Sequence, residues 1–188
     1  MVTLELTNGE VKEMIRDEAM REEFIERMID QYNQQILWLA YSYVKDYSLA
    51  EEITQDVFLT CYHKIDTFRH DSSIRTWLYR ITVNKCKDCL RKKKIRAFLT
   101  FENQKQENLV IEEAHPESIA FQTMEDQLLS ERVLSLPTKF KEVIFMHYFE
   151  EMKIQEIADV LGAKVNTVKT RLKRGRAMLK SMYEEGSE

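Results

Sequence analysis

The chain has 188 residues and a net charge of −4, with 44% hydrophobic and 32% charged residues. This length suits one large or two small domains, and the composition is typical of a folded, helix-rich protein. No apolar run approaches the ~20 residues that span a bilayer, and the first residues lack a basic-then-apolar signal pattern, so we expect neither membrane insertion nor export. Three cysteines, an odd number, favour a reducing cytoplasm over a disulfide framework.

Charge is distributed unevenly along the chain. Residues 1–60 hold 13 acidic and 5 basic residues, and residues 102–126 hold seven acidic and one basic residue. Residues 85–96 hold seven basic residues and one acid, and residues 164–180 hold seven basic residues and no acid. This separation indicates two basic patches suited to DNA and acidic surfaces suited to a protein partner.

The first half of the chain predicts an all-α fold. Neither Gly nor Pro occurs between Glu10 and His115, and no stretch alternates like a strand. Apolar residues recur at helical spacing in three segments. These are Phe24, Met28, Tyr32, Ile36, Leu39 and Tyr43, then Ala50, Ile53, Val57, Phe58 and Cys61, then Trp77, Leu78, Ile81 and Leu90. Residues 63–75 break the period and predict a loop.

The second half predicts a linker and a further helical domain. Periodicity fades over residues 99–124, where acids, Gln and Asn dominate, and this is typical of a flexible acidic linker. Apolar residues then return around 128–136 and 143–148. We therefore expect an N-terminal extension (1–20), a helical domain (21–98), the linker (99–124) and a second helical domain (125–188).

Residues 154–179 predict a helix-turn-helix. One apolar face precedes the turn and consists of Ile154, Ile157, Ala158 and Leu161. Gly162 follows where a helix end favours positive φ, and a new apolar stripe begins at Val165. We expect Asn166 or Thr167 to cap the second helix. Such a helix enters the DNA major groove, and its basic face suits phosphates and base edges. A surface hairpin with a solvated charged face is the alternative.

Two blocks of the sequence resemble bacterial group 4 sigma factors, the extracytoplasmic function (ECF) type of the sigma-70 family. The first block resembles sigma region 2 through Ala50–Phe58 (AEEITQDVF), Phe68-Arg69, Thr76–Ile81 (TWLYRI) and Asn84. The second resembles region 4 through Leu136-Pro137, Glu156–Ala158, Leu161-Gly162, Thr167–Leu172 and Arg174–Arg176. The blocks stand in the family's order and together cover about residues 20–182. One departure is Lys164-Val165-Asn166, where many members have Pro-Val-Gly.

The resemblance implies a factor that binds core RNA polymerase, directs it to the −10 and −35 promoter elements and nucleates melting. Clamp helices of the largest subunit would dock on Glu51, Glu52, Gln55, Asp56, Phe58 and Leu59. The −10 element, with a flipped base in the loop, would be bound by Phe68, Arg69, His70, Asp71, Ser72, Ser73, Trp77, Asn84, Lys85, Asp88 and Arg91. The −35 element would be bound by Thr167, Lys169, Thr170, Arg171, Lys173, Arg174 and Arg176, with Arg171 and Arg176 on the phosphate backbone. For Trp77, a place in the core is equally compatible with the sequence.

The resemblance further implies contact with the polymerase flap region, with duplex and single-stranded promoter DNA and with an anti-sigma factor. Cys86 and Cys89 form one CxxC inside a predicted helix, with only Cys61 and His63 nearby, so we expect no metal and no cofactor. No arrangement typical of catalysis is present, and we expect no enzyme activity. Two other functions remain open, a stand-alone helix-turn-helix regulator and a helical adaptor.

Overall fold

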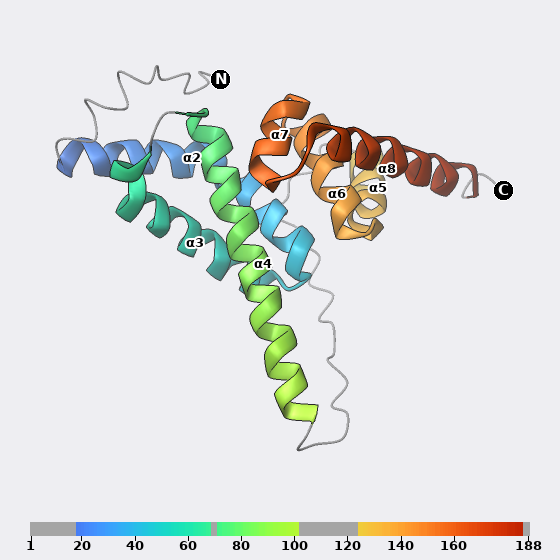
Figure 1. Ribbon diagram of the computed structural model, residues 1–188, viewed down its shortest axis with the longest axis horizontal. Coiled ribbons are helices and arrows are strands. Elements are labelled where there is room, and N and C mark those ends of the chain that lie inside the picture. Colours follow the sequence, from blue (N-terminus) through green and yellow to red (C-terminus); the bar gives the residue numbers. More distant parts are fainter. Residues whose placement is uncertain (1–17, 69–70, 102–123, 186–188) are drawn as a thin grey trace.

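The computed structural model describes residues 18–68, 71–101 and 124–185, and every regular element in them is a helix (Figure 1). The elements are α2 (Glu18–Val44), α3 (Tyr47–Lys64), a 3-10 turn η1 (Ile65–Thr67), α4 (Ile74–Phe101), α5 (Met124–Ser135), α6 (Thr138–Ile144), a π-helical turn η2 (Phe145–Phe149), α7 (Ile154–Leu161) and α8 (Val165–Glu185). The predicted all-α fold class is confirmed. None of the described helices is long and apolar enough to cross a membrane.

The N-terminal helices α2, α3 and α4 enclose one core. The side chains that fill it include Phe24, Met28, Leu39, Val57, Cys61, Leu78 and Tyr79, each at most 1% exposed. Between α2 and α3 the chain turns at Lys45, which adopts a left-handed φ of 57°. Asp46 then caps α3, because its carboxylate accepts a hydrogen bond from the Leu49 amide at 3.0 Å.

The C-terminal helices α6, α7 and α8 form a second core together with η2. Val143, Met146, Ile157 and Val168 are completely buried in it. α8 approaches α6 closely at Gly175, where an added Cβ would lie 3.0 Å from Cγ1 of Ile144. A side chain at position 175 would therefore press against Ile144, which would have to shift by a few tenths of an ångström.

Helix α4 links the two halves of the molecule. Its first half packs against α2, α3 and α7, whereas its second half projects away from the other helices (Figure 1). The basic side chains 91–94 and 96 on the projecting half are exposed. The structure thus displays these basic side chains at the surface, where Nζ of Lys93 lies 4.0 Å from the Asp46 carboxylate.

The two halves also contact each other through the second half of α2. Residues 36–40 and 42–44 are all buried, because α3 and α4 cover one side of α2 and α6 covers the other. The Trp38 ring stacks on Phe145 with a centroid distance of 4.2 Å and lies 6.1 Å from Phe149. A helical segment that is apolar all round is stable only when other elements cover it on all sides. This segment of α2 is covered by helices of both domains and therefore joins them.

Two hydrogen bonds also join α4 to the C-terminal domain. Arg75 donates to the Glu150 carbonyl at 2.9 Å, and Arg80 donates to the Asp159 carbonyl at 3.1 Å. Burial at the interface raises the pKa of the Glu150 carboxyl, which Tyr79 and Arg75 partly oppose. Polar and apolar contacts thus both hold the two domains against each other, and we call this packed state the closed arrangement.

Two lysines meet at one edge of the interface. Lys45 and Lys141 both donate to the Leu134 carbonyl, at 2.8 and 3.1 Å. Lys141 is only 3% exposed. Burial, and then the neighbouring charge of Lys45, lower the pKa of Lys141 to about 7.

This lowered pKa predicts a stability that rises with pH. Above about pH 7 folded Lys141 is neutral while the unfolded side chain still holds its proton, so the unfolded state binds more protons. We expect the free energy of unfolding to increase by about 1.5 kcal/mol between about pH 7 and about pH 8.5, and Lys141→Met to remove most of this increase. Lys45, whose pKa burial also lowers, contributes in the same direction. Urea denaturation at several pH values measures it. The window stops there because the buried thiols of Cys61 and Cys86, whose pKa values rise to about 12, act in the opposite direction at higher pH. An identical slope in Lys141→Met would assign the effect to another group.

Candidate nucleic-acid interface

The turn between α7 and α8 has helix-turn-helix geometry. Gly162 ends α7 in the left-handed conformation with φ 61°, and the Ala163 amide bonds back to the Ala158 carbonyl at 2.9 Å. The predicted role of Gly162 is confirmed. The Lys164 carbonyl then accepts the Thr167 amide at 2.8 Å, which starts α8 one residue later at Val165.

The prediction that Asn166 or Thr167 caps α8 is wrong. Both residues lie inside the first turn of the helix, because α8 begins at Val165. The Asn166 carbonyl instead accepts a hydrogen bond from the Thr170 hydroxyl at 2.8 Å. The residue before the helix is Lys164, whose side chain offers no acceptor, and the helix is positioned by packing and not by a side-chain cap.

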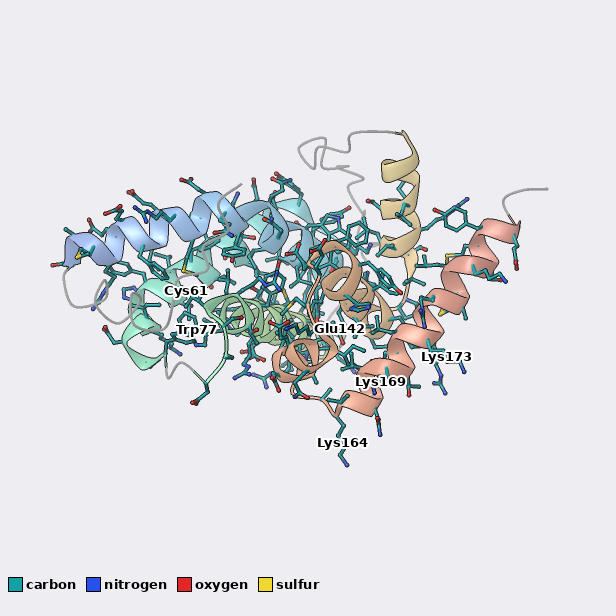
Figure 2. All side chains as sticks on the ribbon, turned by 90° about the horizontal axis from the view of Figure 1, so that it is seen from above. Cys61, Trp77, Glu142, Lys164, Lys169 and Lys173 are labelled. Carbon is teal, nitrogen blue, oxygen red and sulfur yellow. The ribbon has the colours of Figure 1, made fainter. Side chains whose placement is uncertain are left out.

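α8 separates its apolar and basic faces. Val168, Leu172 and Gly175 are buried against the rest of the C-terminal domain, and Thr167 is half-buried. The predicted DNA-binding side chains that are exposed are Lys169, Thr170, Lys173, Arg174 and Arg176. Figure 2 shows Lys164, Lys169 and Lys173 along the outer side of this helix, pointing away from the other helices. This face offers a continuous row of cations to a polyanion.

Arg171 differs from its basic neighbours on α8. Its guanidinium donates to Oε1 of Glu142 at 2.8 Å, and its side chain is 28% exposed. The sequence places Arg171 among the phosphate-binding residues. In the structure, which contains no DNA, its guanidinium bonds the buried carboxylate of Glu142.

The second predicted DNA site lies before and along α4. Phe68 is 7% exposed and packs against the half-buried Trp77, with a distance of 5.4 Å between the ring centroids. Arg69 and His70 lie outside the described residues. Asp71 is exposed. Ser73 caps α4, because its hydroxyl oxygen accepts the Thr76 amide at 3.1 Å.

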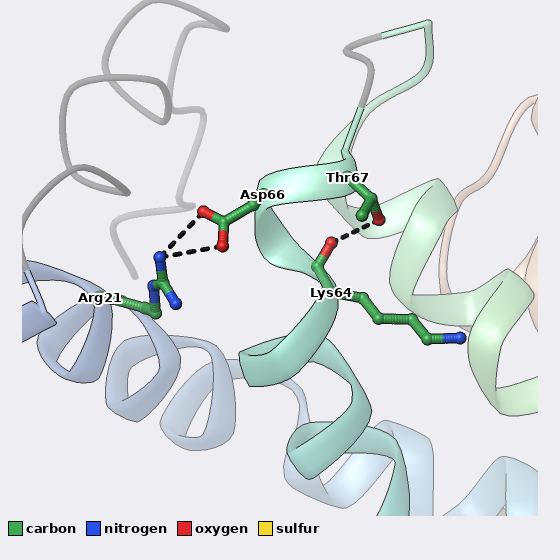
Figure 3. A network of polar contacts seen from close by, with 4 residues as sticks. All are labelled: Arg21, Lys64, Asp66 and Thr67. Carbon is green, nitrogen blue, oxygen red and sulfur yellow. Dashed lines mark hydrogen bonds and ion pairs between the residues drawn. The ribbon is translucent and has the colours of Figure 1, made fainter.

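The start of this loop is held by a residue that the sequence reading did not identify. Arg21, on the first turn of α2, donates to both carboxylate oxygens of Asp66 at 2.9 and 3.0 Å (Figure 3). The Thr67 hydroxyl donates to the Lys64 carbonyl at 2.7 Å in the same turn. Arg21 and Asp66 are 45 residues apart in sequence, so no local pattern reveals the pair.

The basic residues predicted on α4 are partly engaged by acids. Asn84 is exposed, but Lys85 binds Asp56 of α3 at 3.2 Å. Arg91 and Asp88 form an exposed ion pair at 3.1 Å. Lys85, predicted to contact the −10 element, and Asp56, predicted to contact polymerase, thus belong to one ion pair.

The predicted polymerase-binding face of α3 is open to solvent. Glu51, Glu52, Gln55 and Asp56 are exposed, Leu59 is 57% exposed and Phe58 is buried. Beside them runs an apolar groove of about 550 Å³ lined by Ile25, Ile29, Asn33, Gln55, Phe58, Leu59 and Tyr62. An apolar groove beside exposed carboxylates suits a protein partner better than DNA.

The cysteines lie in the protein interior. Cys61 and Cys86 are completely buried, and burial raises the pKa of each thiol to about 12. Cys89 is half-buried. Among the residues that the structure describes, no group of three or more His, Cys, Asp or Glu side chains is placed to hold a metal ion.

A helix-turn-helix with an exposed basic face defines a DNA-binding protein, and two family models match the domains that carry its surfaces. Residues 28–95 match sigma-70 region 2, and residues 126–179 match sigma-70 region 4. The chain belongs to the ECF group of the sigma-70 family and is a transcription initiation sigma factor.

Individual relatives agree with the family models. The chain is 33% identical over 164 residues to the ECF RNA polymerase sigma factor SigW of Bacillus subtilis, covering 84% of this chain and 88% of SigW. It is 34% identical over 159 residues to SigV of the same organism, covering 81% and 86%.

Two solved structures share the fold. The sigma factor RpoE from Bartonella quintana, in complex with the anti-sigma factor NepR, has a TM-score of 0.68 at 19% identity and covers 85% of this chain and 96% of that one. CnrH in complex with the cytosolic domain of CnrY has a TM-score of 0.63 at 20% identity, covering 93% and 95%.

Proposed function

We propose that α8 reads the −35 promoter element and that α4 with its preceding loop binds the −10 element. The observation that carries this proposal is the exposed basic row on α8, backed by Val168 and Leu172 in the core. Lys169, Lys173 and Arg174 are free of any carboxylate in the described part of the chain. These cations are therefore available to bases and phosphates.

We propose the following division of the chain. Residues 21–98 form the domain that binds core polymerase and melts the −10 element, and residues 125–188 form the −35 domain. Residues 99–124 connect the two domains, and residues 1–20 are an N-terminal extension. The helix α4 runs to Phe101 and therefore extends three residues beyond the first proposed domain.

The partners follow from the surfaces. The exposed face of α3 and its apolar groove suit the clamp helices of the largest polymerase subunit, and the C-terminal domain suits the flap region. RpoE was solved in complex with the anti-sigma factor NepR, which supports a similar inhibitor for this chain. We place the protein in the cytoplasm, where it acts without catalysis of its own.

Three substitutions on α8 test the −35 assignment. Lys169→Ala and Arg174→Ala are expected to weaken binding of the holoenzyme to a cognate −35 element by about 1–3 kcal/mol, with little change on a scrambled element, because base-edge contacts carry the specificity. Arg176→Ala is expected to weaken both equally and to reduce the salt dependence of binding. Titration of labelled duplexes at several salt concentrations measures these effects.

Lys180→Ala is the matched control for these variants. Lys180 is exposed on the same helix but lies toward its end and pairs with Glu184 at 3.6 Å. The Lys180→Ala substitution removes one positive charge but leaves the proposed DNA-reading residues unchanged. Equal losses on cognate and scrambled DNA for Lys169→Ala and Arg174→Ala would contradict their role in reading bases.

The alternative of a stand-alone regulator is tested with the full chain alone. We expect weak binding to duplex promoters, because the net charge is −4 and residues 1–60 and 102–126 are acidic. Core polymerase is expected to restore specificity. Tight, sequence-specific binding by the free chain would favour the stand-alone regulator.

A further inference from the structure

Glu142 on α6 connects the proposed −35 helix with the other domain. Its Oε1 accepts the Arg171 guanidinium of α8 at 2.8 Å, and its Oε2 accepts the Tyr43 hydroxyl of α2. Tyr43 and Glu142 are 99 residues apart in the chain. Glu142 itself is 4% exposed and lies in the interior of the molecule (Figure 2). One buried carboxylate therefore has one partner in each domain.

Both partners are needed while the domains are closed. A carboxylate removed from water is strongly destabilised unless hydrogen bonds and an opposite charge replace the water. Arg171 supplies the charge, and it cannot be deprotonated in a protein. Tyr43 supplies the second donor. Burial and the charge of Glu142 raise the pKa of Tyr43, so its hydroxyl keeps its proton.

Arg171 bonds Glu142 through Nη1, and its side chain is only 28% exposed, so we expect a full contact with a DNA phosphate to turn the guanidinium away from Glu142. In the closed arrangement, moving Arg171 to a phosphate leaves Glu142 buried with one neutral donor. When the domains separate, Tyr43 leaves and water reaches the carboxylate. The cost of releasing Arg171 is therefore lower in the open arrangement.

We propose that Glu142 couples domain packing to DNA binding, so that duplex DNA held by α8 favours separation of the two domains. This inference rests on the proposed reading of DNA by α8. Lys169, Lys173 and Arg174 are exposed while the domains are closed, so DNA has access to the helix before Arg171 is released. By thermodynamic linkage, if bound DNA raises the ratio of open to closed molecules by some factor, the open arrangement binds DNA more tightly than the closed one by that same factor.

The test measures domain separation directly in the full chain. Spin labels are attached at Glu26→Cys on α2 and Lys139→Cys on α6, both exposed positions, in a Cys89→Ser background. Cys61 and Cys86 are buried with raised thiol pKa values and resist labelling. Inter-label distances are recorded without DNA and with saturating −35 duplex, and fluorescence anisotropy of the duplex establishes that it is bound.

In the wild-type chain, saturating duplex is expected to raise the ratio of open to closed molecules by about fivefold or more. Tyr43→Phe keeps the ring but removes the donor. It is expected to raise the open fraction without DNA and to tighten duplex binding, by at most the ratio of the affinities of the open and closed forms. In Glu142→Gln the duplex is expected to leave the distance distribution unchanged. Arg176 is a proposed phosphate contact that is not bonded to Glu142. The Arg176→Ala variant is expected to need more DNA for saturation, but its domains are expected to separate as in wild type.

The outcomes separate the inference from the proposed function. Binding of the duplex with no change in the wild-type distances overturns the coupling but leaves α8 as the reading helix. Absence of specific binding, even with core polymerase present, overturns both. If Glu142→Gln does not fold, Tyr43→Phe decides alone, and an open fraction and affinity equal to wild type would reject the coupling.

Discussion

Trp38→Ala is expected to lower the free energy of unfolding by about 3–5 kcal/mol, because it empties the centre of the domain contact. The Trp38 ring is 5% exposed and lies 4.2 Å from the Phe145 ring. Few side chains around such a cavity can move to fill it, since Trp38 lies inside one continuous, closely packed cluster of buried side chains from both domains. Urea denaturation followed by circular dichroism measures the loss.

The shape of the transition carries additional information. While the domains are packed together, we expect wild type to unfold in one transition, and Trp38→Ala to separate it into two. Tyr148→Ala is the matched control, because this aromatic residue in η2 is 50% exposed. It is expected to change stability by less than about 1 kcal/mol. A comparably small loss in Trp38→Ala would mean that the domain contact contributes little to stability.

Substitutions in the loop before α4 are expected to slow strand opening by roughly tenfold or more, with little effect on the closed promoter complex. A base enters a protein pocket only after it leaves the stack, so the contacts of the pocket exist only in the open state. Losing one or two hydrogen bonds of about 1 kcal/mol each accounts for an effect of this size. Asp71→Ala and Ser72→Ala remove polar groups from the described part of the loop.

The structure decides which variants are informative here. Phe68→Ala confounds recognition with folding, because Phe68 is 7% exposed. Ser73→Ala removes the cap of α4 and loses stability for that reason. His63→Ala, at an exposed position on α3, is the control. Transcription is compared on a fully paired template and on one already mismatched across the −10 element. Pre-melting is expected to relieve much of the defect, and wild-type transcription from the paired template would reject the pocket.

The helices themselves were predictable because their apolar spacing is regular. Ile157, Ala158, Val168 and Leu172 are buried as their spacing indicates. The helix-turn-helix followed from this spacing and from Gly162. The cap of α8 was not predicted correctly, because Asn166 suits a cap by residue type while packing starts the helix at Val165.

The contact between the domains was not predicted, although one signal for it is present in the sequence. The stretch ILWLAYSYV at residues 36–44 is almost continuously apolar, and a helix with one buried face would show polar residues there. The partners of this stretch, such as Phe145 and Glu142, are about a hundred residues away. Pairs at that separation leave no local periodicity from which they can be read.

The same separation affects how the protein is made. Tyr43 leaves the ribosome 99 residues before Glu142, and translation adds about 5–20 residues per second. The apolar side of α2 around Trp38 is therefore uncovered for about 5–20 s in every newly synthesised molecule. During that interval the N-terminal domain can fold, but its exposed aromatic surface is a binding site for chaperones and a site of self-association. Expression of residues 1–98 alone would make this interval permanent.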